Sequence, residues 1–256
     1  MSGAGWIAGA CMAQAVAMVA CLEAGFRLGA RDGRRAGAHK GLGAIEAALF
    51  ALLGLLLGFA FAGATSRLDA RRELIVHEAN AIGTAYLRTD LLPAAAQSEV
   101  RALFRRYVEA RLRAFDRSLD AKGLARASSD ASALQQNLWA AAIAARGLDA
   151  TGDVARVVIP ALNEMIDVTT ARMVAQQTRL PALILWLLVG LSLLSALVAG
   201  YAMAARGRRS VLHMMLYAAA ISLTTYAVLD LDNPRLGLIR LDAAERVLQR
   251  LHDSIR

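Results

Sequence analysis

The sequence predicts an all-α membrane protein with four transmembrane helices and a helical soluble insert between the second and the third. Of its 256 residues, 57% are hydrophobic and 20% are charged, and the two kinds are segregated along the chain. Four apolar runs of about 20 residues each match a hydrocarbon core about 30 Å thick. Between them the chain shows no alternating strand pattern. The runs cover residues 5–22, 42–64, 180–205 and 211–229.

The first run is the least typical of the four because it is rich in Gly and Ala and contains Gln14. No Lys or Arg precedes it, as one would in a signal peptide, so we expect a membrane span. The residues before Cys21 faintly resemble a lipoprotein cleavage box, but the basic leader of such a box is missing. Cys11 and Cys21 match neither a disulfide framework nor a zinc spacing, and we expect them to pack as small apolar residues.

The second run continues into charged residues without a helix breaker. A basic, glycine-rich loop over residues 25–41 precedes it. The helix is expected to extend through about Leu87 and to stop before Pro93. A helix that continues past the bilayer, with Arg just beyond the apolar run, is typical of a pore-lining span. It is equally typical of an ordinary span that leads into a helical domain.

The insert after this helix is predicted to be helical throughout. Apolar residues at helical spacing predict a helix over about 95–122, and Gly123 is expected to terminate it. A second helix is predicted over 128–146, closed by Gly147. Each helix has one apolar stripe, so the helices must pack against each other or against neighbouring subunits.

The last helix of the insert is expected to begin near Asp153, to kink at Pro160 and to run into the third apolar run. The chain therefore divides into four parts. They are the first transmembrane pair with its basic loop (1–65), the helical insert (66–179), the second transmembrane pair (180–229) and a tail with a turn and a short helix (230–256).

The formal net charge is +8, and nearly all of the basic residues are Arg. No aromatic-interleaved basic stretch supports nucleic-acid binding, which leaves membrane lipid and anions as the expected partners. Basic residues near the span ends balance between the two sides, so the positive-inside rule gives no orientation.

Catalytic and metal-binding patterns are missing from the sequence. The four His residues form no pair at metal-ligand spacing, and no nucleophile motif or phosphate-binding glycine loop occurs. Asp230, Asp232 and Asn233 could bind a hard cation, but Asp and Asn before Pro are more typical of a turn. We expect no enzymatic activity, no cofactor and no metal site.

A series of short motifs follows in a recognisable order over about residues 42–241. Gly58 and Phe59 precede Arg67 at the exit of the second run, and Leu180 and Pro181 open the third. The other motifs are residues 72–73, 78–83, 87–88, 92–93, 138–139, 163–167, 172 and 232–237. In these motifs the chain resembles the bacterial bestrophin-like membrane proteins, a family largely of unknown function that is distantly similar to bestrophin ion channels.

The similarity to bestrophins themselves is weaker. Leu68 and Asp69 stand where bestrophins carry a Trp-rich signature. Arg235 and Leu236 replace the Phe of their Pro-Phe-Gly turn. The acidic calcium clasp of animal bestrophins has no counterpart here.

The resemblance implies five subunits around one axial pore, with the second span lining it and with the insert and both termini in the cytoplasm. It also implies a hydrophobic neck, whose positions correspond to Leu55 and Phe59 on one helix face. The third neck position is Ala51, which would shorten the neck unless Leu52 takes its place. Rings of such side chains would gate by excluding water. The alternative is ordinary packing against helices or lipid.

Arg67 and Arg71, one turn apart at the exit of this span, are the candidate ion-selectivity residues. A symmetric ring of guanidinium groups would concentrate anions and penalise cations. The alternative, common at span ends, is contact with lipid phosphate.

Together these features predict a bestrophin-like oligomeric ion channel, a pentamer with several spans per subunit in the bacterial inner (plasma) membrane. Anion passage is slightly favoured. The expected partners are membrane lipid, permeant ions and further copies of the chain, with no nucleic acid. The alternative is a non-conducting membrane signalling or scaffold protein whose helical insert binds a partner.

Overall fold

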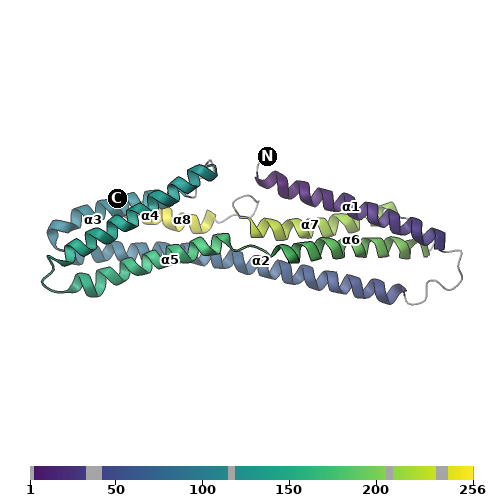
Figure 1. The fold of residues 1–256 in the computed structure, drawn as a ribbon, viewed down its shortest axis with the longest axis horizontal. Helices are drawn as coiled ribbons and strands as arrows, with labels where there is room; N and C mark the ends of the chain where they lie inside the picture. The colour runs from purple at the N-terminus through teal and green to yellow at the C-terminus, as the bar shows by residue number, and fades with distance from the viewer. Residues whose placement is uncertain (1–2, 33–41, 115–118, 206–209, 235–241, 256) are drawn as a thin grey trace. The chain divides into compact units, whose positions relative to one another are not determined.

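The computed structural model describes residues 3–32, 42–114, 119–205, 210–234 and 242–255. Within these ranges every regular element is helical, as predicted (Figure 1). Residues 33–41 and 206–209 of the basic loops, and residues 235–237 of the predicted turn, lie outside the described residues.

The chain divides into two compact units. Unit 1 comprises Met1–Leu68 and Arg179–Ile239, and unit 2 comprises Asp69–Thr178 and Arg240–Arg256. The four predicted apolar runs coincide, to within one residue at their ends, with parts of four helical stretches that are long and apolar enough to cross a membrane. These stretches are Gly5–Arg31, Gly43–Leu91, Val154–Ala204 and Val211–Asp232.

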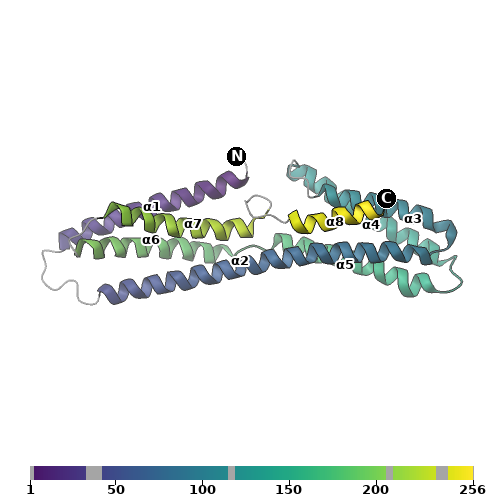
Figure 2. The same ribbon diagram turned by 180° about the vertical axis from the view of Figure 1, so that it is seen from behind.

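Unit 1 is built from four helices. They are α1 (Gly3–Asp32), α2 (Leu42–Leu87) as far as Leu68, α6 (Ala182–Ala205) and α7 (Val211–Asp232). Helix α1 packs along α6 and α7 (Figure 1, Figure 2). Phe50 of α2 joins them through its ring, whose centroid lies 5.6 Å from that of Tyr217 on α7.

Helix α1 is longer than predicted, because residues assigned to the first loop continue the helix to Asp32. Gly25 and Gly29 face the backbone of α6, and Gly200 of α6 faces the backbone of Leu22. A Cβ atom at any of these glycines would collide with that backbone. The glycines that suggested a loop therefore serve close helix packing, a common use of small residues between membrane helices.

Unit 2 contains the rest of α2 and six further helical elements. These are η1 (Arg88–Leu91), α3 (Ala94–Arg113), α4 (Ala121–Arg146), the π-helix η2 (Val154–Val158), α5 (Ile159–Gln177) and α8 (Asp242–Ser254). Helix α3 packs on α4 and α8, and α4 packs on α5. The core includes Ile75, Ile82, Phe104, Tyr107, Leu138 and Met165. The amphipathic helices thus bury their apolar stripes against each other.

The predicted helix over 95–122 is wrong at its end, since α3 stops at Arg113. Gly123 does not terminate a helix but lies in the first turn of α4, where its backbone N–H donates to the Asp120 carboxylate at 2.7 Å. Asp120 is the N-cap of α4, because its side chain satisfies an amide that has no partner inside the helix. Helix α4 therefore begins at Ala121, ahead of the predicted residue 128.

Pro160 lies in the first turn of α5, directly after the π-helical turn η2. In a regular α-helix its ring would clash with the carbonyl of Arg156, and the wider π turn relieves that clash. Asp149 organises the entry to this turn by accepting the Val154 N–H at 2.7 Å and the Thr151 hydroxyl at 2.7 Å. These hydrogen bonds from Thr151 and Val154 hold the pKa of Asp149 below its usual range.

Candidate functional site

The predicted neck residues lie on exposed parts of α2 in the single chain. Phe59 is 68% exposed, Leu55 is 55% exposed and Leu52 is 52% exposed. Ala51 is exposed as well. Apolar side chains that are this exposed in a membrane helix contact either lipid or another subunit.

The opposite face of α2 packs inside unit 1. Its buried residues recur every three or four positions, as Leu53, Leu57, Ala60 and Ala64. Leu55 lies midway between Leu53 and Leu57 in sequence, about 200° from each around the helix axis. The packing of the subunit therefore points Leu55 away from its own core, and Phe59 lies one turn further along the same face.

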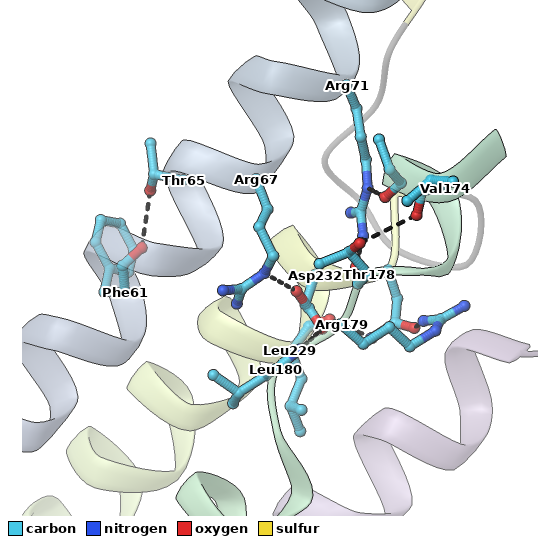
Figure 3. Close-up of polar contacts among 12 residues, drawn as sticks. Phe61, Thr65, Arg67, Arg71, Val174, Thr178, Arg179, Leu180, Leu229 and Asp232 are labelled. Carbon is cyan, nitrogen blue, oxygen red and sulfur yellow. Dashed lines mark hydrogen bonds and ion pairs between the residues drawn. The ribbon is translucent and has the colours of Figure 1, made fainter. Parts of the chain in front are cut away.

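Arg67 makes an ion pair within unit 1. Its Nε lies 2.7 Å from Oδ1 of Asp232 at the end of α7, and Oδ2 of that carboxylate accepts the Leu180 N–H at 2.8 Å (Figure 3). Arg67 lies about a third of a turn around the helix from Leu55. Its guanidinium is thus directed to α7, and its Nη2 is buried with no hydrogen-bond partner among the described residues.

Arg71 is 5% exposed and stabilises the end of α5 in unit 2. Its Nε donates to the Ala175 carbonyl at 3.1 Å, and its Nη2 donates to the Thr178 carbonyl at 2.6 Å (Figure 3). The last carbonyls of a helix have no partner inside the helix, and a cation also interacts favourably with the helix dipole there. The single chain therefore gives Arg71 a structural role at this helix end.

Asp232 and Asn233, for which a turn was favoured, are buried at the end of α7. Asn233 donates from Nδ2 to the Leu229 carbonyl at 2.8 Å and accepts a hydrogen bond from Nη1 of Arg179. These side chains bind the entry of α6 to the end of α7. In the described ranges, no group of three or more His, Cys, Asp or Glu side chains could hold a metal ion.

Polar side chains also join the apolar helices of unit 1. Gln14 of α1 donates from Nε2 to Ser192 of α6 at 3.1 Å and to Thr225 of α7 at 3.4 Å. Such hydrogen bonds stabilise helix association in a membrane. Cys11 is free and buried beside Leu229, which confirms its prediction as a small packing residue.

A buried charge cluster in unit 2 was not predicted. Glu78 of α2 is fully buried and accepts a hydrogen bond from Arg111 Nε of α3 at 2.5 Å and another from Arg172 Nη1 of α5. Burial would lower the pKa of Arg111, but the attraction of the Glu78 carboxylate outweighs it and raises that pKa. The helical period placed position 78 on the buried side with Ile75 and Ile82, which was the available signal.

A second polar contact lies beside this cluster. The Tyr107 hydroxyl is 3.1 Å from the Thr169 hydroxyl, and Gln135 donates to it at 3.0 Å. Burial raises the pKa of Tyr107, so its hydroxyl stays protonated at neutral pH. These contacts connect α3, α4 and α5 around the charged residues.

The chain matches a known protein family. The family described as the Bestrophin-like domain matches residues 12–244, from within α1 to the beginning of α8. Comparisons with curated proteins and with solved structures gave no match.

Proposed function

Because the chain belongs to the bestrophin-like family and carries four apolar helices typical of a multi-pass membrane protein, we propose that it is an ion channel of the bacterial inner membrane. Five copies would surround one axial pore, and the Leu42–Leu68 part of α2 would line it. The observation that carries the proposal is the outward face of α2 with Leu55 and Phe59.

Small residues next to this face support the proposal that the α2 helices of neighbouring subunits pack closely against one another. A Cβ atom at Gly54 or Gly58 would meet no side chain and no backbone of another segment within 4 Å in the single chain. Ala51 and Ala62 are exposed too. Small residues let membrane helices approach one another, so neighbouring α2 helices could pack side by side while Leu55 and Phe59 point to the axis.

In this arrangement Leu55 and Phe59 form two apolar rings that gate by excluding water from the constriction. Ala51 contributes a smaller ring, so the neck is short unless Leu52 turns toward the axis. The net charge of +8 and Arg67 favour anions. We expect the preference to be slight, because Asp232 balances the charge of Arg67 in each subunit.

The test is ion flux through the purified protein in liposomes. Phe59→Ala is expected to raise the flux by hydrating the neck, and Phe59→Trp is expected to lower it. Phe61 is the matched control, since it has the same side chain on the same helix but points elsewhere and is 46% exposed. Phe61→Ala and Phe61→Trp should leave the flux unchanged. The reversal potential in a chloride gradient measures the anion preference.

The rival function is a non-conducting scaffold whose helical insert binds a partner. Native mass measurement separates the two, because a pore on a shared axis needs an assembly of several copies. A monomer or dimer, or a flux that Phe59 and Phe61 variants alter equally, would overturn the channel proposal.

A further inference from the structure

Unit 2 contains a pocket of about 230 Å³ between α3, α4 and α5. Its inner end is formed by Arg111, Thr169 and Arg172, each more than nine-tenths buried. Water occupies about 30 Å³ per molecule in the liquid, so the pocket has room for several non-hydrogen atoms.

The other walls of the pocket carry apolar side chains, with Gln176 and Ser128 as the polar ones. Leu124 and Ala125 of α4 and Met173 of α5 line its sides. Ser128 of α4, which is only partly buried, adds a hydroxyl nearer the opening. A ligand in this pocket would thus meet positive charge at one end and hydrocarbon along its length.

Two guanidinium groups and one carboxylate meet at the inner end of the pocket. Arg111 and Arg172 share the carboxylate of Glu78, so these three side chains carry a formal charge of +1. None of the described residues that line the pocket bears a carboxylate. Arg111 uses Nε for Glu78, which leaves its Nη edge for a ligand.

We propose that this pocket binds a small organic anion, a carboxylate with a short apolar chain. A guanidinium group offers paired N–H donors that match the two oxygens of a carboxylate. The Ser128 hydroxyl can donate to the same anion, and the chain lies against Leu124, Ala125 and Met173. This site is separate from ion conduction, because all of its residues belong to unit 2 and none is a neck residue.

The test is calorimetric titration of the full-length protein in detergent with sodium butyrate. Butyramide, the uncharged analogue, and inorganic phosphate, an anion without a chain, are the matched ligands. We expect saturable binding of butyrate, no binding of butyramide and weaker binding of phosphate. Arg111→Gln should weaken butyrate binding by about tenfold or more, because it removes a charge-assisted hydrogen bond.

Arg111→Gln also removes an ion-pair partner of Glu78, which could destabilise the fold of unit 2. A second variant that leaves this ion pair intact therefore tests the pocket independently of folding. Ser128→Leu places a bulky group in the pocket, whereas Ser129→Leu alters an exposed neighbour that does not line it. Butyrate binding should be lost in the first and kept in the second. Equal binding of butyramide or phosphate, binding unaffected by Ser128→Leu, or no saturable binding of butyrate would overturn the proposal. Liposome flux is a separate measurement, so the channel proposal can fail without this one.

Discussion

Glu78 holds three helices of unit 2 together from a fully buried position. A carboxylate taken out of water is costly unless charged partners and hydrogen bonds compensate it. Arg111 and Arg172 supply both, since each donates to a different oxygen of the carboxylate. The cluster therefore ties α3 and α5 to α2 more specifically than apolar contact alone.

Replacing Glu78 by Gln should strongly destabilise unit 2. The amide leaves two buried guanidinium groups without a counter-charge, and breaking such a pair costs about 3–5 kcal/mol. The measurement is the free energy of unfolding from chemical denaturation of the purified protein. Glu73→Gln on the same helix is the control, because Glu73 is exposed. Equal stabilities of the two variants would show that the buried pairing contributes nothing.

The partners of the charged residues could not be predicted from the sequence. Helical periodicity places Glu78 on the buried side of α2, but 29 basic residues are available to pair with it. The sequence predicts Arg67 and Arg71 as candidate ion-selectivity residues. Their contacts with Asp232 and with the end of α5 join residues more than 100 positions apart in the sequence. No local pattern contains that information.

Among the elements of unit 1, α1 and α6 pack with their backbones close together. Gly25 and Gly200 sit where a Cβ atom would collide with the facing backbone. Within a lipid bilayer the hydrophobic effect does not drive helices together, so close van der Waals contact contributes to their association. The packing of α1 against α6 therefore requires that these glycines carry no side chain.

Gly200→Ala should separate α1 from α6 and lower the melting temperature of the protein in detergent. Gly190→Ala on the same helix is the matched control, since a Cβ atom there would meet nothing within 4 Å. It should be neutral or slightly stabilising, because Ala is favoured over Gly in a helix by up to about 1 kcal/mol. The packing account is wrong if both variants melt at the same temperature.

The existence of the helices was predictable, whereas several of their ends were not. Run length and helical period depend on the local sequence, so the four apolar stretches and the amphipathic insert helices were found. The ends of α1 and α3 and the start of α4 were wrong. The sequence pattern places Gly29 in a loop and Gly123 at a helix end, because a glycine has the same appearance in a sequence whether it ends a helix or lies within one.

In the four-span arrangement that we propose, the insert and the C-terminal tail lie on the same side of the membrane. Two spans precede the insert and two separate it from the tail, so an even number of crossings lies between them.

Cysteine labelling tests this topology. In a background with Cys11 and Cys21 replaced by Ala, we expect Ser129→Cys in α4 and Ser254→Cys in α8 to react with a membrane-impermeant maleimide from one side. Arg31→Cys at the end of α1 should react from the other. All three positions are exposed. Labelling of Ser129→Cys and Ser254→Cys from opposite sides would exclude the four-span arrangement, and the reactive side gives the orientation.

The sequence by itself determined the class of this protein, the number of apolar helices and the family, because each depends on composition, run length or short motifs. The tertiary structure decided which face of α2 is left uncovered, which groups bind the side chains of Arg67, Arg71 and Glu78, and where a pocket lies beside Arg111. These features arise from packing between segments that are far apart in the chain, where side-chain volume and charge pairing are settled only once the helices meet.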